Sequence, residues 1–425
     1  MSRLLIRGGH VIDPANRREG TFDVLIEDGK IAEVKPSLKV NGAIGVDASN
    51  QTVIPGLIDL HAHLREPGRE DKETIESGAR AALRGGFTTI CAMPNTEPAI
   101  DHRAVVDQVS QQSQRCGAAC VRVIGAITKG RAGHQLTDFG ELFESGCVAL
   151  SDDGNALADS FLMRRALEYA KLFDRPIIQH AEDPRLAAGG MMHEGIIATM
   201  LGLRGIPAAA EEVIVARDLA LAALSGGWIH FAHLSSGRSV ELIRQAKRRG
   251  VRVSCEVTPH HLALTHEAVG AFDTSAKVNP PLRTEEDRLA LVEGLRDGTI
   301  DCIATDHAPH TDWEKASDFE SAPFGTSALE TALSVCIETL VKPDLMRLAK
   351  VIEKLSVAPA RIAGLEAGTL SVGADADLTL IDPDASWMVD PRQFVSKGRH
   401  SPFAARKLPC VVTQVFRRGT RVYPY

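Results

Sequence analysis

The chain has 425 residues, of which 44% are hydrophobic and 24% are charged, and its formal net charge is −7 at pH 7. This composition is typical of a globular protein, and the length accommodates a barrel of about 250 residues with an attached smaller domain. The acidic balance excludes binding to nucleic acid or an anionic membrane through an overall positive charge. No signal peptide is recognisable, and no run of roughly 18 or more apolar residues predicts a membrane span.

Both ends of the chain consist of short segments in which apolar and polar residues alternate between Asn, Asp and Gly turn signals. Such alternation is typical of half-buried strands. The segments are LLIRGGHVID, TFDVLIEDGKIAEV and GVDASNQTVIPG near the start, and GTLSVGADADLTLIDP, SWMV and VVTQVFRRGTRVYPY at the other end. We predict that residues 1–55 and 366–425 come together as one small β-sandwich domain.

Residues 56–365 alternate apolar, strand-like runs with amphipathic helical patterns such as KETIESGARAALRGG and EEVIVARDLALAALS. Continuous apolar strands followed by helices indicate a parallel sheet that is covered on both faces. The strand candidates are GLIDLHAH, FTTICAMPN, VRVIGAIT, CVALSDD, PIIQHAE, WIHFAHLS, RVSCEVTPHH and DCIATDHAPH. Eight such units predict a (β/α)8 barrel of the TIM type.

The eight cysteines are scattered along the chain and form no CxxC motif. Several stand inside the apolar runs, as in ICAM and DCIAT. We therefore expect buried, reduced thiols and a cytoplasmic protein.

Most of the predicted barrel strands end in residues that can bind a metal ion. Because the carboxyl ends of barrel strands form one face of the molecule, these residues should converge on one pocket. They are His61, His63, Asp153, His180, His233 and Asp306. Imidazole and carboxylate ligands without thiolate favour Zn²⁺, with Mn²⁺, Co²⁺ and Ni²⁺ as alternatives. Six ligands are too many for one tetrahedral ion and suit two.

The sequence pattern supports some of the individual ligand roles and leaves others open. His61 and His63 are two apart on a strand and so point the same way, although an isolated HxH is more often a pair of hydrogen-bonded histidines. A hydroxide held between two ions is a nucleophile at neutral pH, and Asp306 can bind metal with one oxygen and transfer a proton with the other. The pattern leaves open whether Asp153 or its neighbour Asp152 bridges the ions.

Two long stretches, DLHAHLREPG (residues 59–68) and ATDHAPHTDWEK (residues 304–315), resemble the dihydroorotases of the amidohydrolase superfamily. MPNT, KVNPPLR and APFGTSALET agree, and the resemblance, which covers essentially the whole chain, is to the bacterial class I enzymes. It implies a (β/α)8 barrel and the reversible cyclisation of N-carbamoyl-L-aspartate to L-dihydroorotate in pyrimidine biosynthesis.

The resemblance also implies roles for particular residues. His61, His63 and Asp306 would bind one Zn²⁺, His180 and His233 a second, and Asp153 would bridge them, with Asp306 as the catalytic acid/base. Substrate contacts would come from His63, Arg65, Asn95, Asn279 and His310 and from the backbone of Phe324 and Gly325. Many relatives bridge their metals with a carboxylated lysine, and CVALSDDG contains none, so the chain could hold one ion or two.

Arg65 bears on the choice of substrate. Dihydroorotate carries a carboxylate, and a guanidinium binds a carboxylate through two parallel hydrogen bonds. The alternative is a surface arginine paired with Glu66 or Glu70. Arg65 and Asp153 favour a dihydroorotase over the hydantoinases and allantoinases, which share the fold and the HxH motif.

Some questions stay open at the level of sequence. A dihydroorotase-like scaffold that only supports aspartate transcarbamoylase is an alternative, but the complete ligand set argues against it. An active enzyme that associates with aspartate transcarbamoylase is compatible with the sequence, and we expect a homodimer. The polar residues 311–324 are either a lid or a static surface loop.

Overall fold

Eight parallel strands form the sheet at the centre of the larger part of the molecule, one from each of the predicted strand segments. They are β6 (Leu57–Ala62), β7 (Phe87–Ala92), β8 (Cys120–Gly125), β9 (Cys147–Ser151), β10 (Ile177–Gln179), β13 (Ile229–Phe231), β14 (Val253–Val257) and β15 (Cys302–Ile303). Each strand lies next to its neighbour in this series. A parallel bridge between Ala62 and His307 brings the segment after β15 back to β6. The predicted TIM-type barrel is confirmed.

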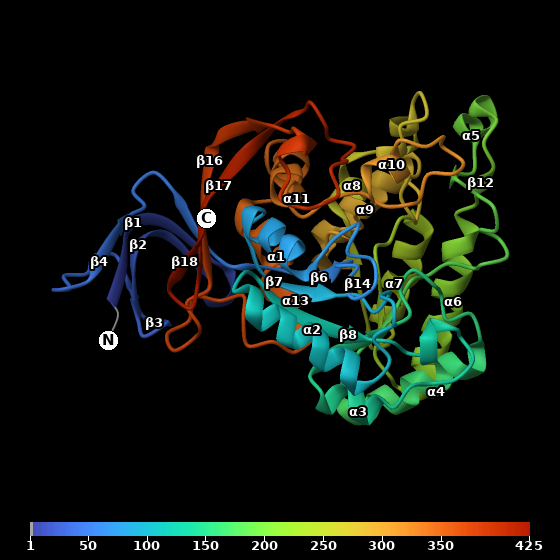
Figure 1. The fold of residues 1–425 in the computed structure, drawn as a ribbon, viewed down its shortest axis with the longest axis horizontal. Coiled ribbons are helices and arrows are strands. Elements are labelled where there is room, and N and C mark those ends of the chain that lie inside the picture. Colours follow the sequence, from blue (N-terminus) through green and yellow to red (C-terminus); the bar gives the residue numbers. More distant parts are fainter. Residues whose placement is uncertain (1–2) are drawn as a thin grey trace.

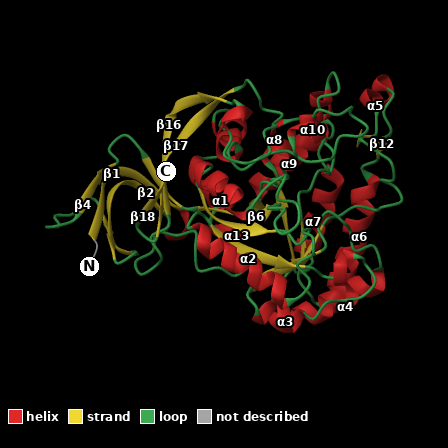
Figure 2. Cartoon of the chain, in the orientation of Figure 1, coloured by secondary structure: helices red, strands yellow, loops and turns green. Residues whose placement is uncertain are grey.

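Helices surround this barrel (Figures 1 and 2). The longer ones are α1 (Ile75–Arg84), α2 (Arg103–Cys116), α4 (Ser160–Ala170), α6 (Ala209–Ser225), α7 (Gly237–Arg248), α9 (Glu285–Asp297), α12 (Leu348–Leu355) and α13 (Val357–Ala363). Their starts follow local chemistry: the Thr74 hydroxyl accepts the Ser77 N–H at 3.0 Å before α1, and Thr284 caps α9 in the same way. Such caps fix where each helix begins and therefore the length of the loop before it.

Shorter elements occupy the connections between the strands and the longer helices. They are α3 (Phe139–Glu144), α5 (Ile196–Leu201), α8 (Pro259–Ala263), α10 (Asp312–Lys315), α11 (Ala332–Cys336) and a two-stranded sheet of β11 (Met192–His193) and β12 (Gly205–Ile206). Helix α10 lies in the segment between Thr311 and Phe324 that the sequence left as a lid or a static loop.

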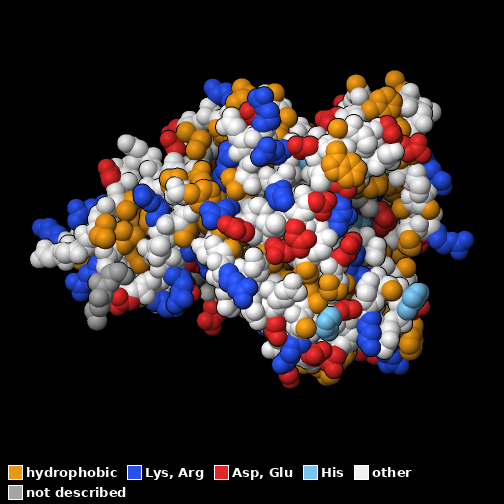
Figure 3. Space-filling view, in the orientation of Figure 1, with side chains coloured by type: hydrophobic (Ala, Val, Ile, Leu, Met, Phe, Trp, Pro, Cys, Tyr) orange, Lys and Arg blue, Asp and Glu red, His pale blue; other side chains and the backbone are white. Residues whose placement is uncertain are grey.

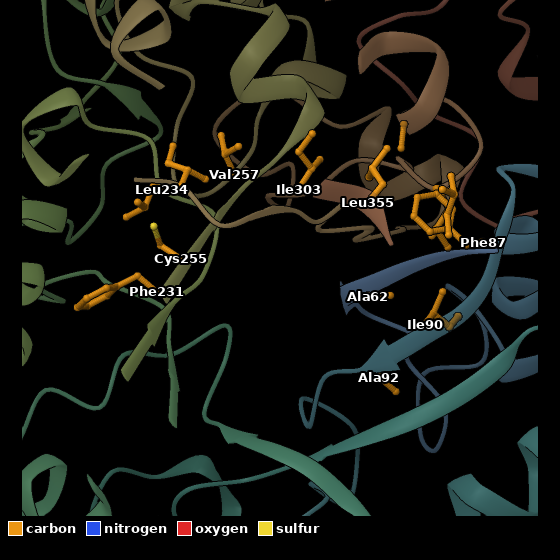
Figure 4. Close-up of a cluster of buried hydrophobic side chains, with 14 of the residues drawn as sticks. Ala62, Phe87, Ile90, Ala92, Phe231, Leu234, Cys255, Val257, Ile303 and Leu355 are labelled. Atoms are coloured by element: carbon orange, nitrogen blue, oxygen red, sulfur yellow. The ribbon is translucent and has the colours of Figure 1, made fainter. Parts of the chain in front are cut away.

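Apolar side chains hold the barrel from both sides. Outward-facing residues such as Phe87, Ile90 and Phe231 belong to the large cluster beneath the helices, part of which is drawn in Figure 4. A second cluster contains Leu60, Cys91, Ile124, Ile178 and Cys302, with Ala358 and Ile362 of α13. All eight cysteines are free, and six of them are buried. The strands are thus fixed on both faces, and their carboxyl ends are held in a rigid frame.

The two ends of the chain form one curved eight-stranded sheet with the strand order β18-β17-β16-β5-β1-β2-β3 and with β4 paired to β1. Its strands are β1 (Arg3–Asp13), β2 (Arg18–Glu27), β3 (Lys30–Lys35), β4 (Ile44–Asp47), β5 (Thr52–Pro55), β16 (Leu378–Met388), β17 (Lys407–Arg417) and β18 (Thr420–Tyr423). Strand β5 pairs with β16, and the core between the folded halves includes Ile6, Val24, Leu378, Leu380 and Phe416. The predicted sandwich from both chain ends is confirmed.

One expectation about this sheet is wrong. GTLSVGADADLTLIDP and SWMV were given as two separate segments, but the end of the first and most of the second belong to the single strand β16, which has a register shift between Asp382 and Ser386. A β-bulge accommodates the Asp-Pro-Asp sequence that resembles a turn, because the long partner strand β17 continues past it. The outer end of this hairpin lies over the barrel near α11 (Figure 1).

The computed structural model describes residues 3–425, so the first two residues of the predicted 1–55 segment lie outside the described residues. Basic and acidic side chains are interspersed on the face drawn in Figure 3. Within residues 3–425, no helix is both long and apolar enough to cross a membrane.

Candidate metal centre and substrate pocket

The six predicted metal ligands lie together at the carboxyl ends of the barrel strands, and all of them are buried. His61 is part of β6 and His63 follows it, whereas Asp153, His180, His233 and Asp306 follow β9, β10, β13 and β15. The barrel topology therefore brings distant positions into contact. His63 Nε2 and Asp306 Oδ1, for example, are 243 positions apart and lie at 3.1 Å.

Asp153 lies between two pairs of histidines. Its Oδ2 atom is 3.3 Å from His61 Nε2 and 3.4 Å from His63 Nε2. Its Oδ1 atom is 3.4 Å from both His180 Nδ1 and His233 Nε2. Each carboxylate oxygen thus faces a different pair of imidazoles, which is the arrangement expected of a group that bridges two cations.

The neighbouring Asp152 is used elsewhere. Its carboxylate accepts hydrogen bonds from the backbone N–H of Thr128 at 3.0 Å and from the Thr128 hydroxyl at 2.5 Å. The geometry thus places Asp153 and not Asp152 among the histidines, so Asp153 stays the candidate for a bridging ligand.

The donor set fits a metal ion. The buried atoms His61 Nε2 and Asp153 Oδ1 have no hydrogen-bond partner within residues 3–425. His61 Nδ1 is 2.8 Å from Glu256 Oε1, so its proton lies on that side and Nε2 presents a lone pair. The ligand atoms of His61, His63 and Asp306 all lie within 4.8 Å of one another, and so do those of His61, Asp153 and His233. Buried nitrogen and oxygen atoms that lack a hydrogen-bond partner cost free energy, and a bound cation would remove this cost.

The two carboxylates and His63 have the charge states that metal binding requires. Burial opposes the charged form of Asp153, but the neighbouring histidines hold its pKa well below the ordinary value. The pKa of Asp306 is lowered against burial by its contact with His63 and by the nearby imidazoles. Burial lowers the pKa of His63, which keeps it in the neutral form that binds metal. Two ionised carboxylates in a buried cluster attract positive charge.

Three residues of this site have backbone conformations that are rare outside glycine. Arg65, His233 and Asp306 have φ angles of 62°, 30° and 46°. Such conformations cost about 1 to 3 kcal/mol each and persist where the surrounding structure over-determines them. At these three positions the unusual backbone belongs to residues that line the cavity described next.

A cavity of about 220 Å³ opens directly over the cluster. It is lined by His63, Arg65, Asn95, Asp153, Gly154, His180, His233, Asn279, Asp306, Ala308, His310, Phe324 and Gly325. Every residue predicted to bind metal or substrate lines this cavity except His61, which is fully buried beside it. Gly154 and Ala308 are the lining residues that the sequence did not single out.

Arg65 provides a positive charge in the wall of the cavity. Its Nε–H donates to the Pro309 carbonyl at 3.2 Å. Glu66 and Glu70 instead accept hydrogen bonds from the backbone N–H groups of Ile75 and Gly68, and no carboxylate of the described residues forms an ion pair with Arg65. The alternative of a surface arginine paired with Glu66 or Glu70 is therefore wrong. Burial lowers the pKa of Arg65 to about 10, so it stays charged at neutral pH.

His310 stands between two fixed partners. Its Nδ1 atom is 3.1 Å from Lys72 Nζ, and because an ammonium can only donate, Nδ1 accepts. The proton is therefore on Nε2, which donates to the Phe324 carbonyl at 2.8 Å. Burial and the charge of Arg65 lower the pKa of His310, so the ring is neutral and presents its edge to the cavity.

Two asparagines complete the polar lining. Asn95 Oδ1 accepts from His63 Nδ1 at 2.8 Å, which orients that imidazole and leaves the Asn95 amide N–H groups for another partner. Asn279 Nδ2 is 3.4 Å from His180 Nε2, and the buried Asn279 Oδ1 atom has no hydrogen-bond partner among the described residues. The cavity therefore offers a guanidinium, amide donors and a free carbonyl acceptor around the metal ligands.

Comparison with known proteins identifies the family. A family model described as "Dihydro-orotase-like" matches residues 50–239. A protein of Pelotomaculum thermopropionicum named dihydroorotase is 52% identical over 96% of this chain and 95% of its own length. Another dihydroorotase, from Anaeromyxobacter sp., is 53% identical over 99% of this chain and 98% of its own. The chain belongs to the dihydroorotase family.

A solved relative outside the dihydroorotases has the same architecture. The L-hydantoinase of Arthrobacter aurescens superimposes with a TM-score of 0.88 over 99% of this chain and 96% of its own, at 25% sequence identity. Dihydroorotases and hydantoinases together identify the chain as a cyclic amide hydrolase. The much higher identity to the dihydroorotases separates the two possibilities that the fold alone leaves open.

Sequence reasoning missed one residue that acts on the metal cluster. Glu256 lies on β14 and accepts from His61 Nδ1 at 2.8 Å, and its other oxygen is 3.2 Å from His230 Nε2. Its pKa is lowered to about 2 against burial, by these two imidazoles. A charged residue within the continuous apolar run RVSCEV was the available signal.

We expect Glu256→Gln to weaken metal binding about 10- to 100-fold, because the amide removes the negative charge that makes His61 a stronger donor. Competition with a chromophoric chelator measures this affinity. Glu330→Gln is the matched control, since Glu330 is also buried but binds the backbone of Val395 and Ser396 away from the cluster. An equal loss of metal affinity in both variants would mean that Glu256 acts only through the stability of the fold.

Proposed function

We propose that the chain is a zinc-dependent dihydroorotase that interconverts N-carbamoyl-L-aspartate and L-dihydroorotate in cytoplasmic pyrimidine biosynthesis. The single observation that carries the substrate is the half-buried Arg65, which has no carboxylate partner among the described residues and faces the same cavity as the metal ligands. A cyclic amide that carries a carboxylate matches this combination.

The ligand set supports two ions. His61, His63 and Asp306 would hold one, His180 and His233 the other, and Asp153 would lie between them. Nitrogen and oxygen donors without thiolate suit Zn²⁺, although Mn²⁺, Co²⁺ or Ni²⁺ would also be accepted. Bound Zn²⁺ would polarise the ring carbonyl and lower the pKa of a water molecule.

Asp306 would move the proton. During ring opening its free carboxylate oxygen accepts a proton from the attacking water and delivers it to the ring nitrogen as the carbon–nitrogen bond breaks. In the direction of synthesis the same carboxylate takes a proton from the ureido nitrogen as that nitrogen attacks the side-chain carboxyl carbon. It then gives this proton to the carboxyl oxygen that leaves as water when the carbon–oxygen bond breaks. Asp306 Oδ1 lies 3.1 Å from His63 Nε2, on the side of the other metal ligands, which leaves Oδ2 for the proton and supports this division between two atoms.

The cavity walls would orient the substrate. Arg65 would bind the ring carboxylate through two parallel hydrogen bonds, and Asn95 and Asn279 would meet the donors and acceptors of the cyclic ureide. His63 and His310, with the backbone of Phe324 and Gly325, would form the remaining contacts. These groups line one cavity together with the ligand cluster, so a bound ring would be held with its amide over the ligands.

The chain would act as a homodimer and could associate with aspartate transcarbamoylase while keeping its own activity. Sedimentation of the chain alone and of a mixture of the two proteins measures both properties.

Removal of metal should abolish ring opening of L-dihydroorotate, and Zn²⁺ should restore it, because the cluster has no other source of a strong nucleophile. The assay follows dihydroorotate, hydantoin and allantoin before chelation, after chelation and during titration with Zn²⁺. Recovery at one or at two equivalents reports the number of ions. Turnover by the metal-free chain would contradict the zinc dependence, and preference for hydantoin or allantoin would contradict the substrate.

A further inference from the structure

Two buried lysines support the wall of the cavity that contains Phe324 and Gly325. Lys277 Nζ donates to the backbone carbonyls of Phe319, Glu320 and Ala322 at 2.6, 3.0 and 2.6 Å. Lys315 Nζ donates to the carbonyls of Pro323 and Gly325 at 3.0 and 2.9 Å. Residues 319–325, which we call the lysine-bound loop, therefore wrap around two ammonium groups.

These lysines are unusual because they lack a carboxylate partner. Lys277 is 3% exposed and Lys315 is 6% exposed, and neither forms an ion pair with any described residue. Buried lysines are rare, and a buried ammonium without a counterion costs free energy. Burial lowers the pKa of Lys315 to about 7, and the pKa of Lys277 is lowered for the same reason. A costly arrangement at the edge of a functional cavity calls for a functional explanation.

Further contacts join the lysine-bound loop to the cavity. The Gly325 N–H donates to the Lys277 carbonyl at 2.9 Å, and the Phe324 carbonyl accepts from His310. Lys277 Nζ also lies 4.9 Å from the centre of the Phe324 ring, within the range of a cation–π contact. Each carbonyl from Ala322 to Gly325 thus accepts a hydrogen bond from Lys277, Lys315 or His310.

Gly325 shows how closely this wall is packed. Its φ angle is 133°, and a Cβ atom there would lie 2.5 Å from the Ala308 carbonyl oxygen. No side chain fits, so the loop is confined between the end of the last barrel strand and the two lysines. A loop packed in this way is a fixed wall and not a lid that opens and closes.

We propose that Lys277 and Lys315 are positioning residues that hold the lysine-bound loop as a preformed wall of the substrate pocket. Their hydrogen bonds fix the backbone of Phe324 and Gly325 and, through the Phe324 carbonyl, the ring of His310. The inference rests on the proposed function in so far as these groups contact dihydroorotate. Neither lysine touches the substrate, and each acts through the backbone that it binds.

The first test measures the loop itself, without any substrate. In Lys277→Met and Lys315→Met, amide hydrogen exchange within residues 319–325 should become at least about tenfold faster than in the wild-type chain. Lys354→Met is the matched control, because Lys354 is also buried and donates to a backbone carbonyl, that of Ile300, away from the pocket. Exchange in the loop that stays at the wild-type rate in both variants would overturn the proposal.

The second test separates binding from chemistry. The KM for dihydroorotate should rise about 10- to 100-fold in both loop variants, while kcat and bound metal change little, because the displaced groups contact substrate and do not take part in proton transfer. Lys277→Gln and Lys315→Gln, which keep donors for the carbonyls, should lie between wild type and the Met variants and replace them if these fail to fold. An equal rise in KM in Lys354→Met would overturn the proposal. A wild-type chain inactive on dihydroorotate would refute the proposed function, whereas the exchange comparison still decides the role of the lysines.

Discussion

The substitution Asp306→Asn is expected to lower kcat for dihydroorotate by about 10²- to 10⁴-fold, the usual contribution of a general acid/base. Asparagine has the same shape, so the contact with His63 at 3.1 Å and the local fold should persist. The amide nitrogen has no basic lone pair, and the side chain can neither accept the proton of water nor return it to the ring nitrogen. Steady-state kinetics with metal analysis of the same sample measures the effect.

The metal content distinguishes the two roles assigned to Asp306. A variant that keeps its metal and loses its rate supports the proton-transfer role, whereas a variant that loses both supports only the ligand role. Asp13→Asn is the matched control, because Asp13 is fully buried but lies in the sandwich. Metal-loaded Asp306→Asn with a kcat close to that of the wild type would refute the acid/base role.

The metal cluster could be predicted because topology alone assembles it. Each ligand interrupts or ends an apolar run, and parallel barrel strands end on one face, so His61, His180 and Asp306 converge without knowledge of any side-chain contact. The choice between Asp152 and Asp153 could not be made in this way. It depends on Thr128, which lies 24 positions away and binds the Asp152 carboxylate. Local alternation says that the two side chains diverge but does not say which one faces the histidines.

The residues that support the site could not be predicted either, because their roles also depend on contacts with distant parts of the chain. Lys277 and Lys315 stand in stretches that are typical of solvent-exposed loops, yet both are buried. Lys277 donates to backbone carbonyls more than 40 positions away, and Lys315 donates to carbonyls later in its own loop. Glu256 was detectable in principle, since a charge in a buried strand requires a partner. The sequence predicted that both chain ends form the sandwich, but it did not predict that β16 is continuous, because this depends on its pairing with β17 across a bulge.

Arg65→Met is expected to lower kcat/KM for dihydroorotate by about 30- to 5,000-fold, which corresponds to the roughly 2–5 kcal/mol lost when one partner of a buried charge pair is removed. The loss should be specific to substrates with a carboxylate. Hydantoin has none, so any turnover of hydantoin should be unchanged, and the ratio of the two kcat/KM values is the measurement. Arg65→Lys should recover only part of the loss, because an ammonium binds carboxylate as a point charge and not through two parallel hydrogen bonds.

The control for this experiment is Arg69→Met, which removes an arginine four positions away that is paired with the exposed Asp71. It should leave both kcat/KM values near those of the wild-type chain. Arg65 also donates to the Pro309 carbonyl and has a left-handed backbone conformation, so its replacement could act through the fold. That case has a distinct signature: activity on both substrates would fall together, with a lower melting temperature. A loss confined to dihydroorotate would instead tie the unpaired guanidinium in the cavity wall to the substrate carboxylate.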